Sequence, residues 1–418
     1  MGNIMISVKE ALHHILESIS PFGVEKVNIL DTLGRVLGED VRAIRDIPPH
    51  DNSAMDGYAV ISEDTCGASA ENPLFFDVIE DVPAGYMPQK IVGFAEATRI
   101  MTGAPIPEGV DAVIPVEETE RIEDNRFKIT KEIGISQNIR SRGEDVREGE
   151  LVLARGKVIR PAEIGMLASV GRSFVSVYQR PLVAIIATGD ELIDVDGNLA
   201  PEKIISSNSY SLAAQVTDCG GVPFRVGIAK DTREDLLAKF REALRADIIV
   251  SSAGVSVGDY DFVKEVMDET GIHIDFWQVA QRPGKPLTFG TRDGKPVFGL
   301  PGNPVSSMLT FEQYVRPAML KMMGHTCLFR KTIDATLREP IEKKKGLRYF
   351  IRAVVGYEND RPVVMTTGAQ GSGILKSMVL ANGIVVLPED VTAVSAGSTV
   401  KVQILDNSLD LTDQPGYL

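Results

Sequence analysis

Cysteine and histidine are scarce in this sequence of 418 residues, which contains three cysteines and five histidines. Cys66, Cys219 and Cys327 lie far apart and fit no C-x-x-C metal-binding pattern. We therefore expect unpaired thiols in a reducing compartment. The histidines form no ligand set with zinc spacing, so a zinc site is not expected.

Long apolar segments and an excess of positive charge are also missing. No apolar stretch approaches the roughly 18–20 residues that cross a bilayer, and the first residues lack the basic segment and apolar run of a signal peptide. Acidic residues outnumber basic ones by 58 to 44, which gives a net charge of −14. A dedicated nucleic-acid binder would carry a basic patch instead. The sequence predicts a cytoplasmic protein that binds neither membranes nor nucleic acid, although local sites can still hold anions.

The chain divides into segments with different hydrophobic patterns, and its length predicts roughly three domains. Residues 7–19 have the apolar spacing of an amphipathic helix, which Ser7 and Glu10 begin with a capping box. Residues 24–178 are rich in short β-like runs between Gly and Pro turns, with one helix expected near residues 161–171. Short strands return after Lys331 and predict a separate all-β domain.

Strands and helices alternate between these β-rich segments. The predicted strands cover residues 180–189, 224–231, 247–254 and 295–303, and the predicted helices cover residues 208–221, 232–245, 262–271 and 304–315. This alternation is typical of a parallel sheet with helices on both faces. Ligands bind beyond the carboxyl ends of such strands, so we expect the loops that follow the strands to form one site.

Carboxylates are frequent in the loops after the first three strands: Asp190, Glu191, Asp231, Asp259 and Asp261. Clustered carboxylates are costly unless a cation neutralises them, and oxygen ligands suit Mg²⁺ better than Zn²⁺. Helix capping explains Asp231 and Asp261 equally well, and Glu191 also suits a solvated turn.

Small residues in the loops after the third and fourth strands predict an anion site. The runs SSAGVSVGD (251–259) and LPGNP (300–304) present backbone N–H groups next to helix N-termini, where phosphates bind. Asn303 and Pro304 also suit the N-cap and first position of the following helix. Ordinary tight turns explain the same glycines and prolines. The sequence contains no Walker A motif and no G-x-G-x-x-G after a strand, which argues against those nucleotide sites.

Positive charge near this edge comes from Arg282 and Lys285 in the run QRPGKP (281–286). Together they suit a phosphate or another oxyanion, since arginine binds through its planar fork and lysine as a point charge. A flexible surface lysine is the plainer interpretation. In the β-rich segment, residues 48–59, 101–105 and 138–145 are dense in polar groups and turn formers, although surface turns alone explain any one of them.

Seven motifs follow one another along the chain: PPHDNSAMDGYA, MTGAPIPEGVDAVIPVEE, IRSRGEDV, ATGDEL, SSAGVSVGDYDFVK, RPGKP and LPGNPVSS. Their order resembles the MoeA family of molybdopterin molybdenumtransferases, which is also seen in the E domain of gephyrin. The resemblance extends from about residue 7 to the C-terminus, and seven motifs in order are far more specific than any one of them.

The resemblance implies a homodimer with four domains in each subunit. It assigns residues 7–26 and 178–327 to an α/β molybdopterin-binding module, residues 27–47 and 148–177 to a linking domain, residues 48–147 to a β-rich lid-like domain, and residues 328–418 to a C-terminal β-barrel-like domain. The site would be a cleft between the α/β module of one subunit and the insert of the other.

The family reaction takes adenylylated molybdopterin and molybdate, inserts the metal and releases AMP, assisted by Mg²⁺. The resemblance therefore implies both molecules as substrates and a molybdopterin adenylyltransferase as the donor of the first. It implies Glu191, Asp231 and Asp261 as residues near Mg²⁺.

Matching motifs imply further site residues. The implied catalytic residues are Asp56, Thr102, Arg140, Asp145, Glu191, Asp231, Asp261 and Lys285. The implied substrate-binding residues are Thr188, Gly189, Asp190, Ser252, Gly254, Ser256, Gly258, Arg282, Pro301, Gly302, Asn303, Pro304 and Ser372.

Two positions depart from the family pattern. Arg282 stands where some members carry lysine, and Leu347 stands where a basic residue can follow Gly346, which leaves the contribution of the tail to the cleft open. Two alternative functions also stay open. One is a molybdopterin adenylyltransferase, which uses the same α/β module and consumes ATP, and the other is a non-catalytic scaffold like gephyrin. The complete insert and tail favour the metal-inserting enzyme.

Overall fold

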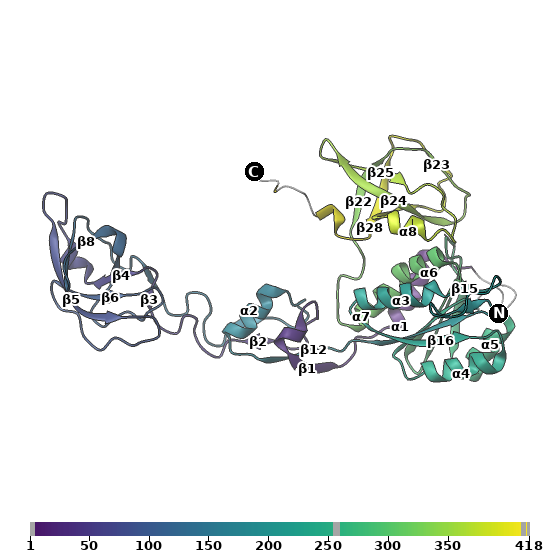
Figure 1. The fold of residues 1–418 in the computed structure, drawn as a ribbon, viewed down its shortest axis with the longest axis horizontal. Helices are drawn as coiled ribbons and strands as arrows, with labels where there is room; N and C mark the ends of the chain where they lie inside the picture. The colour runs from purple at the N-terminus through teal and green to yellow at the C-terminus, as the bar shows by residue number, and fades with distance from the viewer. Residues whose placement is uncertain (1–4, 254–259, 411–414, 416–418) are drawn as a thin grey trace. The chain divides into compact units, whose positions relative to one another are not determined.

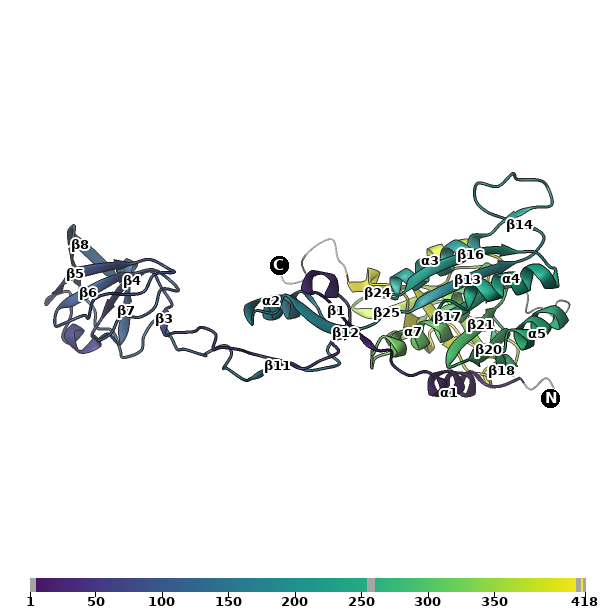
Figure 2. The ribbon, with the colours of Figure 1, turned by 90° about the horizontal axis from the view of Figure 1, so that it is seen from below.

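The computed structural model describes residues 5–253, 260–410 and 415, and for residues 260–264 it describes the backbone alone. The chain forms two compact units (Figures 1 and 2). The first unit comprises Met1–Lys26, Gly34–Gly38 and Ser176–Leu418, and the second comprises Val27–Leu33 and Glu39–Val175. In the described part of the chain, no helix is both long and apolar enough to cross a membrane.

The first helix, α1 (Val8–Ser18), begins as the sequence predicts. The Ser7 hydroxyl oxygen accepts a hydrogen bond from the Glu10 N–H at 3.2 Å, and the Glu10 carboxylate accepts one from the Ser7 N–H at 2.8 Å. These two bonds satisfy backbone donors that the first turn leaves open. Val8, Ala11 and Ile15 are buried on the face that packs against the sheet of the first unit.

That sheet has six strands and is mixed. In spatial order they are β16 (Val222–Ala229), β13 (Leu182–Thr188), β17 (Ile248–Ser252), β21 (Lys295–Leu300), β20 (Pro286–Arg292) and β18 (His273–Gln278). Parallel pairing of the first four confirms the predicted parallel core. The antiparallel hairpin of β18 and β20 was not predicted. Residues 279–285 are too short a connection for a parallel crossover, so the chain turns back.

Helices cover both faces of this sheet, as the alternation predicts (Figure 1). The helices are α3 (Ser207–Asp218), α4 (Arg233–Ala243), α5 (Tyr260–Glu269), α6 (Pro304–Thr310) and α7 (Arg316–Met322), with a π-helical turn at Phe311–Val315 before α7. Alternate residues of one strand serve the two cores: Val183 and Ile185 pack with α1, α3, α6 and α7, whereas Ala184 and Ile186 pack with α4 and α5. This period of two is what a strand buried on both faces requires.

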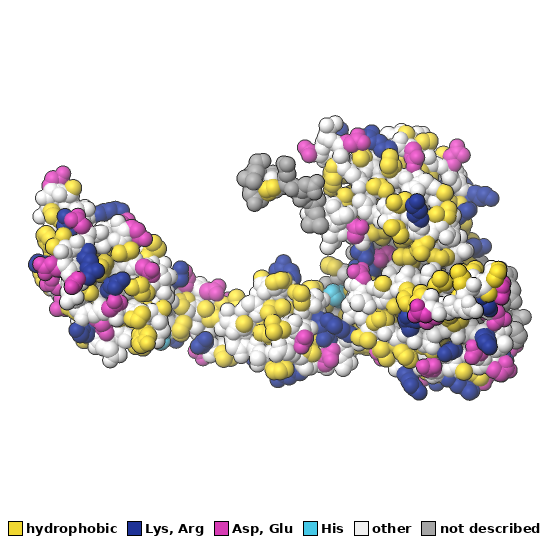
Figure 3. All heavy atoms as spheres, viewed as in Figure 1, with side chains coloured by type: hydrophobic (Ala, Val, Ile, Leu, Met, Phe, Trp, Pro, Cys, Tyr) yellow, Lys and Arg dark blue, Asp and Glu magenta, His cyan; other side chains and the backbone are white. Residues whose placement is uncertain are grey.

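Charged side chains of both signs are interspersed over α4 and α5 on the face drawn in Figure 3. Arg233 and Arg241 of α4 both form ion pairs with Glu269 of α5. The negative net charge of the chain is therefore not gathered into one acidic patch on these helices.

The C-terminal part of the first unit is a closed barrel. Its strands are β22 (Thr332–Leu337), β24 (Arg348–Glu358), β25 (Arg361–Thr366), β26 (Gly383–Leu387) and β28 (Thr399–Ile404), and the pairing of β24 with β26 closes the ring. All five strands fall in the segment predicted to be all-β. The short strand β19 (Gln281–Arg282) pairs with β24, which ties the loop before β20 to the barrel. The remaining elements here are β23 (Ile341–Glu342), β27 (Ala393–Val394) and α8 (Lys376–Leu380).

The second unit is built on another six-stranded sheet. In spatial order its strands are β7 (Ala112–Pro115), β4 (Gly57–Val60), β6 (Glu96–Ile100), β5 (Leu74–Val82), β9 (Arg126–Ile129) and β8 (Thr119–Glu123). In its core, the Tyr58 and Phe127 rings stack with centroids 3.9 Å apart, and Phe76 stacks on Phe127 at 5.5 Å. Two short sheets join β3 (Asn52–Ser53) to β10 (Ile139–Arg140) and β2 (Val41–Arg42) to β11 (Leu151–Leu153). The predicted helix is α2 (Pro161–Ser169).

Replacing glycine with alanine should have opposite effects on stability at two positions of the second unit. A Cβ added at Gly57 in β4 would lie 1.9 Å from the Ile114 carbonyl oxygen, whereas one added at Gly165 in α2 would meet nothing within 4 Å. Gly57→Ala should therefore lower the free energy of unfolding by about 1–3 kcal/mol through overpacking. Gly165→Ala should raise it by about 0.5–1 kcal/mol, because alanine loses less backbone entropy in a helix. Urea unfolding followed by circular dichroism measures both, and equal stability of the two variants would contradict the packing argument.

Candidate functional site

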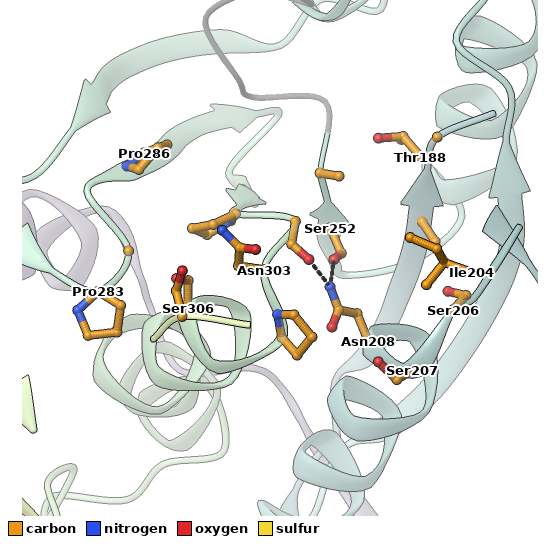
Figure 4. A pocket seen from close by; sticks show the side chains of 18 of the residues that line it. Thr188, Ile204, Ser206, Ser207, Asn208, Ser252, Pro283, Pro286, Asn303 and Ser306 are labelled. Carbon is orange, nitrogen blue, oxygen red and sulfur yellow. Dashed lines mark hydrogen bonds between the residues drawn. The ribbon is translucent and has the colours of Figure 1, made fainter. Parts of the chain in front are cut away.

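A cavity of about 790 Å³ lies at the carboxyl ends of the parallel strands (Figure 4). It is lined by residues that follow β13, β16, β17 and β21, as the sheet topology predicts. The loop before β20 and part of the barrel complete its wall. Its volume is within the usual range for a small-molecule or cofactor site.

Carboxylates from two loops meet at one side of the cavity. The Asp231 N–H donates to Asp190 Oδ1 at 3.1 Å, and the Asp190 N–H donates to Asp231 Oδ2 at 3.3 Å. Glu191 and Asp231 line the cavity. Gly189, which precedes them, has a φ of 146°, a backbone conformation that residues with a Cβ rarely adopt, so the turn into this loop favours glycine. The N-cap of α4 is Thr232, which excludes the helix-cap interpretation of Asp231.

Glu191 and Asp231 are the carboxylates of this cavity that could serve as magnesium ligands. Among the residues that the structure describes, no group of three or more His, Cys, Asp or Glu side chains is arranged to hold a metal ion. Mg²⁺ commonly needs only one or two carboxylates, with water and substrate phosphates as its other ligands. The exposed side chains of Glu191 and Asp231 meet that requirement.

Small polar residues form the floor of the cavity. Thr188 ends β13, Ser252 ends β17, and Asn303 caps α6 with Pro304 at its first position, as predicted. Figure 4 shows Asn208, in the first turn of α3, reaching toward Ser252. Its Nδ2 donates to Ser252 Oγ and to the Gly302 carbonyl oxygen, both at 2.7 Å. The floor is therefore held together by side-chain hydrogen bonds between strand-end loops.

The loop that carries Arg282 and Lys285 lies across the cavity from Thr188, as Pro283 and Pro286 of this loop show in Figure 4. Arg282 and Lys285 are exposed and line the cavity. Gln281 is fully buried beneath them: its Nε2 donates to the Gly284 carbonyl oxygen at 3.0 Å, and its Oε1 accepts from the Tyr314 hydroxyl. Burial raises the pKa of Tyr314, which keeps the phenol protonated as a donor. A buried side chain thus fixes the turn that presents two cations.

The C-terminal barrel contributes Leu347, Gln370 and Ser372 to the cavity. Arg352, 1% exposed, donates to Ser377 Oγ and to the Gly371 carbonyl oxygen, both at 3.0 Å, and so supports the loop that carries Ser372. Burial lowers the pKa of Arg352 to about 10. The barrel therefore contributes to the cavity wall, with Leu347 among its lining residues.

Four further predicted residues belong to the second unit, and two of them, Asp56 and Thr102, are in contact. Both the backbone N–H and the hydroxyl of Thr102 donate to Asp56 Oδ1, each at 2.7 Å. These bonds lower the pKa of the exposed Asp56 carboxyl, which stays ionised. Arg140 pairs with Asn52 between β10 and β3, and the Asp145 N–H donates to the Ile47 carbonyl oxygen at 3.0 Å.

Most of the site residues predicted in the first unit lie around the cavity, and their roles stay a prediction. The predicted residues that line the cavity are Thr188, Gly189, Glu191, Asp231, Ser252, Arg282, Lys285, Pro301, Gly302, Asn303, Pro304 and Ser372, and Asp190 adjoins them through its bonds with Asp231. Gly254, Ser256, Gly258 and Asp259 lie outside the described residues, and Asp261 is described only as a backbone position in the first turn of α5. Asp56, Thr102, Arg140 and Asp145 belong to the second unit.

Sequence reasoning missed the residues at the start of α3, which are Ser206, Ser207 and Asn208. A signal was present: the run SSNS follows the first strand and its loop and precedes an apolar helical pattern, at the sheet edge already chosen. Gln281 and Gln370 were missed as well, since an isolated glutamine in a loop carries no comparable signal.

Models of known protein families match most of the chain. Residues 6–171 match the MoeA N-terminal region (domain I and II), residues 184–321 match a probable molybdopterin binding domain, and residues 334–405 match the MoeA C-terminal region (domain IV).

Individual relatives give the same result. The molybdopterin molybdenumtransferase of Staphylococcus aureus strain Mu50 is 38% identical over 406 residues, which cover 96% of both chains. That of Staphylococcus epidermidis strain ATCC 12228 is 37% identical over 407 residues, again 96% of both. The crystal structure of the molybdopterin biosynthesis MoeA protein from Pyrococcus horikoshii superposes with a TM-score of 0.82 at 33% identity, covering 96% of this chain and 99% of that one. With matches of this identity and coverage, the chain belongs to the MoeA family.

Proposed function

We propose that this protein is a molybdopterin molybdenumtransferase, which inserts molybdate into adenylylated molybdopterin and releases AMP in molybdenum cofactor biosynthesis. The observation that carries the proposal is the cavity at the strand ends, with Glu191 and Asp231 on one side and Arg282 and Lys285 on the other. The curated relatives named as this transferase match the chain over 96% of its length, which supports the same activity.

The charge arrangement suits this pair of substrates. Glu191, Asp231 and Asp261 would hold Mg²⁺, which polarises the phosphate linkage of the adenylylated substrate when it is bound. Arg282 and Lys285 would receive oxyanions, among them molybdate. Thr188, Ser252 and the 301–304 loop would bind phosphate oxygens through hydroxyl and backbone N–H donors.

The remaining assignments extend this proposal. The protein would act as a cytoplasmic homodimer that receives its substrate from a molybdopterin adenylyltransferase. Residues 48–147 would form the lid-like domain, and residues 27–47 and 148–177 the linking domain. Asp56, Thr102, Arg140 and Asp145 would then complete the cleft of the partner subunit. The ionised Asp56, fixed by Thr102, supports a role in that cleft.

The central experiment incubates purified protein with adenylylated molybdopterin and Mg²⁺, with molybdate added or omitted, and follows AMP release and cofactor formation. We expect AMP release to depend on molybdate and to accompany active cofactor. A parallel reaction with molybdopterin and ATP tests the adenylyltransferase alternative. Tight substrate binding without turnover would instead favour the scaffold function.

Asp231→Asn should weaken the activation of the protein by Mg²⁺. Loss of one carboxylate charge should raise the Mg²⁺ concentration for half-maximal activity and lower turnover, each by about tenfold or more. Asp235→Asn is the matched control, because Asp235 accepts a hydrogen bond from the Lys230 N–H in the same loop but does not line the cavity. Magnesium titrations of the two variants measure the effect. An unchanged titration for Asp231→Asn would remove Asp231 from the metal site.

Mixing two inactive variants tests the shared cleft. Asp56→Asn and Asp231→Asn should each retain about a tenth of wild-type activity or less when assayed alone. In a two-fold dimer with shared sites, a dimer that contains one subunit of each variant has one intact site. After equimolar mixing and re-equilibration about half of the dimers are of this kind, so the mixture should recover about a quarter of wild-type activity. A mixture of Asp231→Asn with Lys285→Ala, whose altered residues lie in one unit, serves as the control and should recover none. Equal recovery by the two mixtures would contradict a site shared in this way.

A further inference from the structure

Asn208 joins three loops at the floor of the cavity. It belongs to the first turn of α3, which follows β13 and its loop, and its side chain reaches Ser252 at the end of β17 and Gly302 after β21. The residue is 9% exposed and lines the cavity. None of the motifs that carry the family resemblance contains it.

The chemistry of its partners fixes the orientation of this amide. The Gly302 carbonyl oxygen can only accept a hydrogen bond, so the Asn208 NH₂ group must face it. The second hydrogen of the same group points to Ser252 Oγ. Because Ser252 accepts this bond, its own hydroxyl hydrogen is directed elsewhere. In the described part of the chain, that hydrogen has no protein acceptor, and Ser252 lines the cavity.

We propose that Asn208 is a positioning residue that makes Ser252 a hydrogen-bond donor toward a phosphate oxygen of the substrate. The Asn208 amide also binds the Gly302 carbonyl oxygen. Without that bond, the phosphate oxygen would face a second hydrogen-bond acceptor. The inference rests on the proposed function for the identity of the phosphate-bearing substrate, and AMP, the expected product, supplies the probe.

Replacing the amide with a carboxylate reverses this polarity. In Asn208→Asp, the carboxylate can only accept, so Ser252 turns its hydrogen toward residue 208 and away from the substrate, and a negative charge is added beside the anion. Asn208→Ala removes the bond but leaves Ser252 free to donate. The expected order of AMP affinity is therefore wild type, then Asn208→Ala, then Asn208→Asp.

A matched variant distinguishes the proposed positioning role of Asn208 from a purely structural role of its buried amide. Gln215 lies on the same helix, and its Nε2 donates to the Met308 carbonyl oxygen at 3.1 Å. Its Oε1 is buried and has no partner among the residues that the structure describes. Gln215→Glu therefore buries a carboxylate in a similar setting on α3, but Gln215 does not line the cavity. Loss of stability should be similar for both acidic variants, while AMP affinity should fall only for Asn208→Asp.

The test measures AMP dissociation constants by calorimetry for wild type, Asn208→Ala, Asn208→Asp, Ser252→Ala, the double variant Asn208→Asp/Ser252→Ala, and Gln215→Glu. We expect Asn208→Asp to weaken AMP binding about tenfold and Asn208→Ala about threefold. Ser252→Ala should weaken binding in the wild-type background but add nothing in Asn208→Asp, because the donor is already diverted there.

Each outcome has one meaning. Additive losses for Asn208→Asp and Ser252→Ala, or equal losses for Asn208→Asp and Gln215→Glu, would overturn the positioning role. In turnover assays, the variants should raise the KM for adenylylated molybdopterin more than they lower kcat. Absence of AMP binding to the wild-type protein would count against the proposed function rather than against the positioning of Ser252 by Asn208.

Discussion

The common register of four parallel strands is the constraint on which the site depends. β13 pairs Thr188 with Ala229 and Ala187 with Ser252, and β17 pairs Ser252 with Leu300. The strands therefore end level with one another, and every loop that follows begins from the same edge. Residues separated by more than a hundred positions in the sequence meet there without any long connection. A shift of one strand by one residue would exchange its two buried faces, so the two hydrophobic cores fix this register as firmly as the hydrogen bonds do.

Two sets of backbone and side-chain hydrogen bonds then give the cavity at this edge an acidic side and a basic side. On one side, Asp190 and Asp231 each accept the backbone N–H of the other, which holds two acidic loops together despite their like charges. On the other side, the buried Gln281 shapes the turn that carries Arg282 and Lys285, and pairing of β19 with β24 anchors that turn to the barrel. A chain with a net charge of −14 can in this way present cations to an anion, because short-range placement outweighs distant, screened charge.

Most of this architecture could be predicted from the sequence because it rests on local rules. The capping box of α1, the alternation after residue 180 and the five strands of the barrel are patterns of near neighbours. The hairpin of β18 and β20 was not predictable by the same rule, since alternation alone does not give strand direction. The contact of Asp56 with Thr102 joins residues 46 positions apart, and only motif resemblance connected them beforehand. The run SSNS could have placed Asn208 at this edge, but its partners, Ser252 and Gly302, are set by tertiary packing and could not be predicted.

Some of the buried polar atoms that have no partner among the described residues lie at the same sheet edge as the charged groups of the cavity. Among the residues that the structure describes, Thr188 Oγ1, Ser251 Oγ and Asn208 Oδ1 are buried and have no partner, and they lie at the ends of β13 and β17 and the start of α3. An unpaired buried polar group costs about 1–3 kcal/mol, so folding alone would favour apolar residues at these positions. Sequences depart from such local rules mainly where function requires it. A polar ligand that binds over these strand ends would satisfy groups that the fold leaves open, so the same residues that weaken the folded chain would favour its substrate.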